Sequence, residues 1–354
     1  MAKYKAYVSA PLDAGYLKKL EAICDVTYCG WSIHEGLIYG EDESIEAFHE
    51  ADIIITNYDL ISRRVMEACP NLKLICCCRG NPVNVDSAAA TERGIPVVYS
   101  PGRNANSVAE FLMGALLGLI RNIPLSYHEL REGRFLGAPK ADIYQVPERD
   151  DIVWGFNMGD NQESPFIVYE GYEMFQKTFG MVGYGAVGRR LARFLKAMDV
   201  RVLIYDPYLP AAVAEADGVE RMSLEEMLPQ CDFVSLHCKV TEETKGMFGA
   251  REFGLMKPGA VFINTARGVV VQQRALLEAL EQGKLSGAVL DVFWEEPMPA
   301  NHPLLKMDNV VITPHIAGTS RDVAIHQSIM IIGDVERFVN GEKLQYVFNR
   351  DVLK

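Results

Sequence analysis

Three ionisable residues, Arg267, Glu296 and His315, each follow a short apolar stretch in the second half of the chain. An arginine is a planar double donor suited to a carboxylate, and a histidine titrates near neutrality and can give or take a proton. A glutamate paired with that histidine would favour the imidazolium form. Together they predict a site that holds a carboxylate and moves a proton.

Each of these residues also has a structural explanation when it is taken alone. An Arg-Gly pair after a strand is often a surface turn, and a glutamate before a proline usually faces solvent. A loop histidine is more often structural than catalytic. The catalytic interpretation therefore depends on the elements that bring the three together.

The apolar stretches before these residues are predicted strands. They cover Ala260–Asn264, Gly287–Val292 and Val310–Ile312, and helices are expected between them, among them Gln273–Glu281. The first hundred residues show the same alternation, with expected strands at 5–10, 53–56, 72–78 and 95–99. Strands alternating with helices indicate an α/β fold with doubly wound parallel sheets, whose ligands bind beyond the carboxyl ends of the strands.

The stretch TFGMVGYGAVGRRLARFLKAMDVRVLIYD, residues 178–206, has the order strand, glycine-rich turn, helix, strand and acid. Gly183 allows the tight turn, Gly185 lets the backbone approach a pyrophosphate, and Gly188 lets the helix pack closely on the sheet. The helix N-terminus offers unpaired N–H groups to phosphates. Asp206 stands 18 residues after Gly188, where a carboxylate can accept both ribose hydroxyls. The stretch predicts a bound dinucleotide.

The same carboxylate predicts which dinucleotide binds. Asp206 would repel a 2′-phosphate, and Pro207, Tyr208 and Leu209 supply no arginine to hold one. NAD is therefore expected rather than NADP. With a nicotinamide cofactor, the three ionisable residues match hydride transfer coupled to proton transfer.

Composition excludes several classes of protein. The chain has 354 residues, a net charge of −12 and 49% apolar residues, which favours a globular protein of two domains and disfavours nucleic-acid or anionic-membrane partners. No run of 18 apolar residues occurs. Three of the eight cysteines are consecutive, Cys76, Cys77 and Cys78, which indicates packing residues and no metal site. We expect a reduced, cytoplasmic protein.

Two loops of the first hundred residues are candidates for binding the substrate. The loop after the third strand, RGNPVNVD, could hold a carboxylate through the Gly80 and Asn81 amides, with charge from Arg79; alternatively it only connects strand to helix. The next loop carries Arg103 and Asn104 before a helix expected over 108–120, with Asn106 or Ser107 as its N-cap.

Residues 136–170 show no sustained periodicity, and turn residues are frequent. They are either a linker or, because they include Tyr144, Trp154, Phe156 and Phe166, an ordered excursion that packs on a partner subunit or on the cleft.

The motifs GYGAVGRRLA, MKPGAVFINTARG, GAVLDVFWEEP and TPHIAG occur in this order, with RGNPVNVDSAAATERGIPV and NSVAE before them. In these motifs the chain resembles the D-isomer-specific 2-hydroxyacid dehydrogenases, which include phosphoglycerate, glycerate and D-lactate dehydrogenases. The resemblance implies two Rossmann-like domains with a cleft between them. Residues 1–105 plus 320–354 would form a flavodoxin-like substrate domain, and 106–319 the NAD-binding domain.

The resemblance also implies roles for individual residues. Arg267 would bind the substrate carboxylate and polarise its carbonyl, His315 would be the acid and base, and Glu296 would orient His315. Asp291 would contact the nicotinamide amide. The remaining cofactor-lining positions would be Ala186, Val187, Cys238, Thr265, Ala266 and Gly318. The family pairs through its cofactor domains, so a homodimer is expected.

Some positions depart from the family pattern. Gln272 stands where aspartate is usual, Lys239 where proline is usual, and Pro82 removes an N–H from the carboxylate loop. These departures leave the substrate open. Because Arg79 and Arg103 add to Arg267, a polyhydroxylated or phosphorylated 2-keto acid is expected, unless the two arginines merely face solvent. The alternatives are an NADH-sensing regulator like the carboxyl-terminal-binding corepressors, and a formate dehydrogenase, which would need no histidine.

Overall fold

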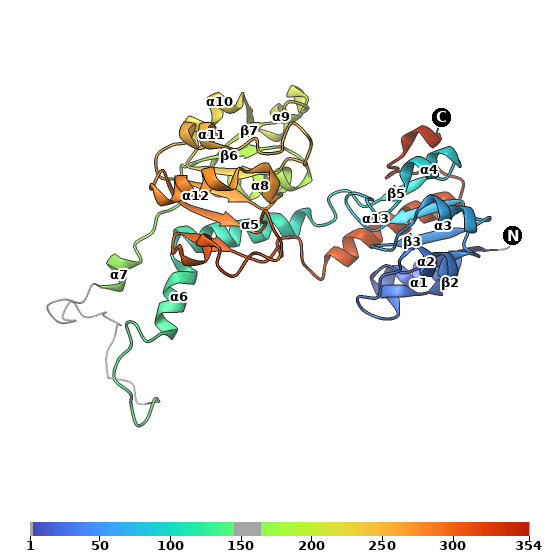
Figure 1. Cartoon of the computed structure of the whole chain (residues 1–354), viewed down its shortest axis with the longest axis horizontal. Helices are drawn as coiled ribbons and strands as arrows, with labels where there is room; N and C mark the ends of the chain where they lie inside the picture. Colours follow the sequence, from blue (N-terminus) through green and yellow to red (C-terminus); the bar gives the residue numbers. More distant parts are fainter. Residues whose placement is uncertain (1–2, 145–163, 354) are drawn as a thin grey trace. The chain divides into compact units, whose positions relative to one another are not determined.

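The structure is a computed structural model, and it describes residues 3–144 and 164–353. The chain divides into two compact units, shown in Figure 1. Unit 1 comprises Met1–Ser107 together with Thr319–Lys354, and unit 2 comprises Val108–Gly318. Each unit contains a parallel sheet with its own hydrophobic core. The predicted fold class is therefore confirmed.

The sheet of unit 1 has five parallel strands in the order β2-β1-β3-β4-β5. They are β1 (Tyr4–Val8), β2 (Cys24–Tyr28), β3 (Ile53–Thr56), β4 (Leu74–Cys77) and β5 (Val97–Tyr99). Only four strands were expected, because the edge strand β2, sequence CDVTY, exposes part of its length and lacks a continuous apolar run.

Helices cover both faces of this sheet. They are α1 (Ala14–Ile23), α2 (Glu41–Phe48), α3 (Arg63–Ala68), α4 (Ser87–Glu92) and the returning helix α13 (Val323–Val339), with short 3₁₀ turns η1 (Gly30–Ser32) and η5 (Arg350–Leu353). Cys76 and Cys78 pack with α13, whereas Cys77 faces the core on the other side of the sheet. The interpretation of the cysteines as packing residues is confirmed, since all three thiols are buried and unpaired.

The tail after α13 returns to the sheet of unit 1. The structure has one antiparallel bridge there, between Val98 and Val347, because Phe348 N donates to Val97 O at 2.8 Å and Tyr99 N to Tyr346 O at 3.0 Å.

The sheet of unit 2 has seven parallel strands in the order β12-β11-β10-β9-β6-β7-β8. They are β6 (Thr178–Val182), β7 (Arg201–Tyr205), β8 (Glu220–Arg221), β9 (Phe233–Leu236), β10 (Ala260–Asn264), β11 (Leu285–Leu290) and β12 (Val310–Ile312). Since β10, β11 and β12 are neighbours, their carboxyl ends meet at one edge. The order reverses at β6 and β9, the point where such folds bind dinucleotides.

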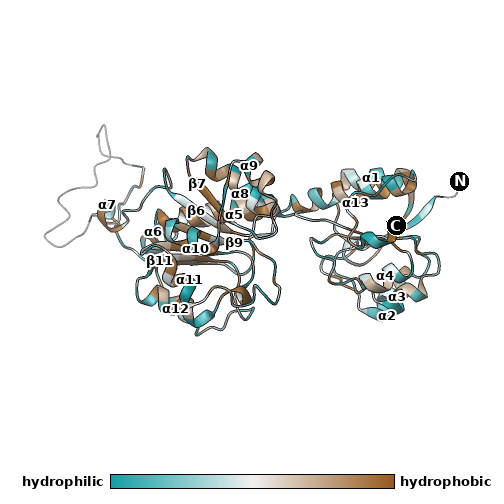
Figure 2. Cartoon of the chain, turned by 90° about the horizontal axis from the view of Figure 1, so that it is seen from above, coloured by the Kyte–Doolittle hydropathy of each residue, from teal (hydrophilic) through white to brown (hydrophobic). Residues whose placement is uncertain are grey.

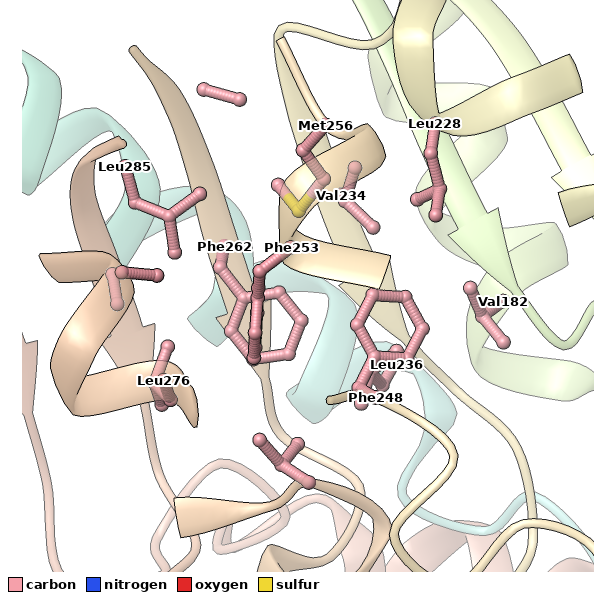
Figure 3. Packing of buried hydrophobic residues seen from close by; sticks show 14 of the residues in the cluster. Val182, Leu228, Val234, Leu236, Phe248, Phe253, Met256, Phe262, Leu276 and Leu285 are labelled. Atoms are coloured by element: carbon pink, nitrogen blue, oxygen red, sulfur yellow. The ribbon is translucent and has the colours of Figure 1, made fainter. Parts of the chain in front are cut away.

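Alternate residues of these strands serve two cores, one on each face of the sheet. The first contains Phe248, Phe253 and Phe262, whose ring centroids lie 5.1–5.8 Å apart (Figure 3). The surrounding helices are α8 (Ala186–Ala197), α9 (Ala211–Asp217), α10 (Leu224–Met227), α11 (Ala250–Leu255) and α12 (Gln273–Glu281), with 3₁₀ turns η2 (Leu228–Gln230), η3 (Gly268–Val270) and η4 (Pro303–Lys306).

Helix α5 (Ala105–Ile120) packs in the second core of unit 2, where Ala109, Leu112 and Leu116 are fully buried. The expected N-cap at Asn106 or Ser107 is wrong, because the helix already begins at Ala105. Within the described residues no single helix is long and apolar enough to cross a membrane. Helices α5 and α6 (Ile123–Arg131) reach that length and hydropathy only when they are taken together, and they are bent by 63° at the break between them.

Helix α6 and the short helix α7 (Pro165–Val168) form an arm on unit 2. Tyr169 donates to Glu129, and the Phe135 and Tyr169 rings meet edge to face at 5.6 Å. No residue of either helix is buried. Figure 2 shows α7 as hydrophobic. Tyr144 and Phe166 belong to the described part, whereas Trp154 and Phe156 of the expected excursion lie outside it.

Candidate active site

Glu296 and His315 form a hydrogen-bonded pair at the carboxyl edge of the unit 2 sheet. His315 Nδ1 lies 2.7 Å from Glu296 Oε2, and Glu296 Oε1 accepts from Phe293 N at 3.0 Å. Glu296 follows β11 and His315 follows β12. Because these two parallel strands are neighbours, the two side chains meet although they are 19 residues apart in the sequence. His315 has the left-handed φ of 58°, a conformation that costs a non-glycine residue energy and is common at functional sites.

The charge state of Glu296 follows from its surroundings. Partial burial raises the pKa of this carboxyl, but the hydrogen bonds from His315 and Phe293 N and the positive charge of Arg267 hold it below the usual value. The carboxylate is therefore ionised at neutral pH, as a partner for an imidazole must be. A cavity of about 480 Å³ lies beside the pair, lined by Phe293, Glu296, Pro297, Met298, Ile312, Thr313, Pro314 and His315.

Arg267 belongs to the same edge, one strand further along. It is exposed at the start of η3, and its Nη1 donates to Ala266 O at 2.6 Å. Gly268 explains the Arg-Gly pair: a Cβ there would lie 2.2 Å from Phe293 C, so only glycine lets this turn pack against the loop that carries Glu296. The structure thus places the three predicted catalytic residues on neighbouring strand ends.

Asp291 ties the histidine loop to β11. It is fully buried and accepts from Thr313 Oγ1 at 2.6 Å, Ile316 N at 2.8 Å and Ala317 N at 2.8 Å. It therefore fixes the turn on which His315 sits. Its expected contact with the nicotinamide amide stays a prediction.

Asn264 is a positioning residue that the sequence reasoning missed. Its side chain accepts from Ala266 N at 3.0 Å and donates to Arg267 O at 2.9 Å, which shapes the turn after β10. The signal was available, because an asparagine often closes a turn onto the backbone two residues later.

The glycine-rich turn has the geometry of a phosphate site. Gly183 has a φ of 91°, and a Cβ there would lie 2.8 Å from Cys238 N. Gly185 has open space around its Cα and caps α8 without a side chain, so the first N–H groups of the helix stay available. A Cβ on Gly188 would lie 3.3 Å from Gly183 O, which fits its predicted packing role.

Asp206 directly follows β7 beside this turn. Its Oδ2 accepts from Tyr184 N at 2.9 Å and its Oδ1 from Tyr208 N at 3.0 Å, which leaves lone pairs on both oxygens for ribose hydroxyls. A cavity of about 400 Å³ joins Asp206 to Gly183, Gly185 and Cys238. Burial raises the pKa of the Cys238 thiol, so this cysteine lines the cavity as a neutral side chain.

Two polar atoms at this edge of the sheet are buried without a hydrogen-bond partner among the described residues, His237 Nε2 and Thr265 Oγ1. Such atoms are rare in folded proteins and call for a ligand or water. With the glycine cradle and Asp206, they fit a dinucleotide. The remaining expected cofactor residues follow the same strand ends or begin α8: Ala186, Val187, Ala266 and Gly318.

The substrate candidates of unit 1 differ in their surroundings. The Arg79 guanidinium lies 4.5 Å from the Tyr58 ring centroid, and Tyr58 stacks on Trp31 at 5.6 Å. Gly80 and Asn81 are exposed and Asn104 is half-buried. Arg103, in contrast, donates to the buried Gln327 of α13. The strand ends of unit 1 also carry two buried atoms, Asn57 Oδ1 and Ser100 Oγ, that have no hydrogen-bond partner in the described part of the chain and that the sequence reasoning did not single out.

Residues 113–317 match the family profile described as D-isomer specific 2-hydroxyacid dehydrogenase, NAD binding domain. The chain belongs to the D-isomer specific 2-hydroxyacid dehydrogenase family. It is accordingly an NAD-dependent oxidoreductase of that family. The described residues contain no group of three or more His, Cys, Asp or Glu that could hold a metal ion.

Full-length similarities agree with this family. The YoaD protein of Bacillus subtilis is 36% identical over 98% of this chain and 95% of its own length. A glyoxylate reductase of Thermofilum pendens is 33% identical over 100% of this chain and 97% of its own. Among solved structures, the apo D-lactate dehydrogenase of Escherichia coli superposes with a TM-score of 0.71 at 26% identity, covering 98% of this chain and 99% of that one.

Proposed function

We propose that this D-2-hydroxyacid dehydrogenase acts on a polyhydroxylated or phosphorylated 2-keto acid and its D-2-hydroxy acid. The reaction is supported by the Glu296–His315 pair, whose atoms lie 2.7 Å apart beside Arg267. The substrate class is supported by Arg79, which Tyr58 and Trp31 hold at a strand end of unit 1.

The residues divide the chemistry as follows. The Arg267 guanidinium binds the substrate carboxylate and draws electron density from the adjacent carbonyl. His315 uses Nδ1 toward Glu296, so its Nε2 is the atom that gives a proton to the keto oxygen during reduction and takes it back during oxidation. Glu296 holds the ring in that orientation and balances the imidazolium charge. Bound NADH supplies the hydride.

Of the two arginines in the loops of unit 1, we base the substrate class on Arg79, because part of the Arg103 guanidinium is already bonded to Gln327. A guanidinium that lies on an aromatic ring keeps its edge N–H groups free for an anion while its face is held. We therefore assign Arg79 to the phosphate or hydroxyl groups beyond the 2-keto acid.

An NADH-oxidation screen over 2-keto acids tests both levels of the proposal. The panel contains sugar acids, phosphorylated acids, pyruvate and glyoxylate. Arg79→Ala should raise KM for the preferred acid by about tenfold or more, the worth of a charge-assisted hydrogen bond, and change KM for glyoxylate far less. The matched control is Arg64→Ala, which removes an exposed arginine paired with Glu41 and Asp42.

The outcomes separate the substrate from the reaction. An equal effect of Arg79→Ala on every acid, or a wild-type preference for pyruvate or glyoxylate, would exclude the substrate class but keep the dehydrogenase. Absence of turnover with any acid would favour the NADH-sensing regulator instead.

We also propose that the protein is a homodimer that pairs through the α6–α7 arm. Apolar side chains on this arm are strongly exposed, including Tyr127 at 62%, Phe166 at 70% and Ile167 at 70%. Apolar patches of this kind mark interaction sites. The apolar face of helix α5, in contrast, is covered inside unit 2. Light scattering should give a dimer, and Phe166→Asp a monomer; a wild-type monomer at micromolar concentration would contradict the proposal.

We also propose a cytoplasmic location. All eight cysteines are unpaired, which favours a reducing compartment and so a cytoplasmic protein.

A further inference from the structure

A side-chain bridge lies beside Asp206 in the lining of the proposed cofactor cavity. Tyr208, just after β7, donates from its phenol to Glu243 Oε2 at 3.0 Å, and Glu243 belongs to the loop after β9. Asp206, Tyr208 and Glu243 all line the same 400 Å³ cavity. Because the Tyr208 N–H donates to Asp206 Oδ1, Tyr208 is bonded to one carboxylate at each end.

The loop that carries Glu243 is held in place. Thr244 Oγ1 donates to Lys239 O at 2.7 Å, and Thr241 N donates back to Thr244 Oγ1 at 2.8 Å. Beyond the loop, Gly246 N donates to Val269 O at 2.8 Å, which pins it to η3. Glu243 therefore occupies a defined position at the rim of the cavity.

The charges of the lining disfavour an additional phosphate. Asp206 and Glu243 are two carboxylates, and Lys239 is the one permanent cation among the described residues that line the cavity. His237 adds no charge, because burial lowers its pKa to about 4. The lining is therefore one charge negative at neutral pH, whereas a 2′-phosphate brings up to two further negative charges and needs cations around it.

We propose that Glu243, held by Tyr208, is a second determinant of NAD over NADP beside Asp206. It acts from a different loop, 37 residues further along the chain. The bridge places its carboxylate at the rim where a 2′-phosphate would enter, so that phosphate is repelled from both sides of the ribose. The inference rests on NAD as the cofactor and is independent of the substrate proposal.

Binding of NADH and NADPH to the protein without substrate tests the proposal. Calorimetry gives Kd for both nucleotides, and the quantity compared is the ratio of Kd for NADPH to Kd for NADH. Glu243→Gln should lower this ratio about tenfold at low salt, as expected for one charge acting on a dianion a few ångströms away. The change should shrink in about 0.5 M salt, because charge effects near the surface are screened.

The matched control is Glu242→Gln, the neighbouring residue of the same loop. Its side chain is 88% exposed, is paired with Lys245 and does not line the cavity. This variant should keep the wild-type ratio. Equal changes in the Glu242 and Glu243 variants would overturn the proposal, because the loop's net charge would then explain both.

Tyr208→Phe separates the bridge from the charge, since it removes the phenol and keeps the Glu243 carboxylate. The freed carboxylate can move toward solvent, so the ratio should fall by less than in Glu243→Gln. A ratio unchanged in Glu243→Gln, or a wild-type protein that binds NADPH about tenfold more tightly than NADH, would each refute the role of Glu243. A ratio unchanged in Tyr208→Phe would refute the part assigned to the bridge.

Discussion

Two strands of the same sheet are each followed by a histidine, His237 after β9 and His315 shortly after β12, and the two differ in almost everything else. His237 Nε2 is buried without a partner among the described residues, and burial lowers its pKa to about 4. The His315 side chain is 42% exposed and is bonded to Glu296 at 2.7 Å. Position at a strand end thus does not by itself give a histidine a carboxylate partner and access from solvent, the two features that suit His315 to the proton transfer proposed for it.

The largest difference between the two histidines should appear in kcat when each is replaced by glutamine in turn. His315→Gln is expected to lower kcat about 10³-fold while NADH still binds, because only the proton donor is lost. His237→Gln should act mainly on the Kd for NADH. Stopped-flow kinetics measure the loss of turnover, and titration with NADH measures the change in Kd. A His315→Gln variant that keeps more than about a tenth of wild-type kcat would show that the two histidines do not differ in the way proposed.

Removing the carboxylate partner should cost less than removing the histidine. Glu296→Gln keeps a hydrogen-bond acceptor for Nδ1 but loses the charge, so kcat should fall roughly 10- to 100-fold. Steady-state kinetics of keto-acid reduction measure this loss. A kcat equal to that of the wild type would argue against a catalytic role for the pairing seen in the structure.

The buried histidine should show itself in stability rather than in turnover. Between the usual value of 6.5 and about 4, the unfolded chain takes up a proton at His237 that the folded protein refuses. Stability should therefore fall as pH drops through this window, by roughly 3 kcal/mol from this residue. Urea unfolding of His237→Gln should lack that part of the fall; identical pH curves for the variant and the wild type would contradict it.

A third histidine should give the smallest effect. His302 is buried, which lowers its pKa, and its Nδ1 accepts from Leu304 N at 3.3 Å. Its Nε2 lies 2.8 Å from the Gln273 side-chain Nε2, so the Gln273 amide is its hydrogen-bond partner. Gln273→Leu should cost about 1 kcal/mol of stability and leave kcat alone. A lower kcat in Gln273→Leu would contradict this prediction, because it would show that His302 contributes to turnover.

Much of the site was predictable because it depends on strand order. The ends of β10, β11 and β12 follow from apolar runs that are easy to recognise, and parallel pairing then brings Arg267, Glu296 and His315 together. The edge strand β2 and the acidic helix α2 were missed, since neither has a strong apolar period.

Contacts between distant segments were beyond the sequence patterns. Arg103 donates to Gln327, 224 residues away, and no local pattern indicates that pairing. The expected role of Arg103 toward the substrate stays a prediction. The Tyr208–Glu243 bridge likewise joins two loops 35 residues apart. Both depend on how the loops at a sheet edge converge, which only the folded chain determines.

The discontinuity of unit 1 has a consequence for the order of synthesis. Unit 2 is one continuous segment that ends at Gly318, whereas the core of unit 1 includes Ile331, Ile332 and Val347 from the last part of the chain. On the ribosome the nucleotide-binding half can therefore close its core while the amino-terminal half still waits for α13. The part of unit 1 that is translated first is therefore the last to complete its core. Until α13 is made, its apolar residues stay exposed and open to chaperones.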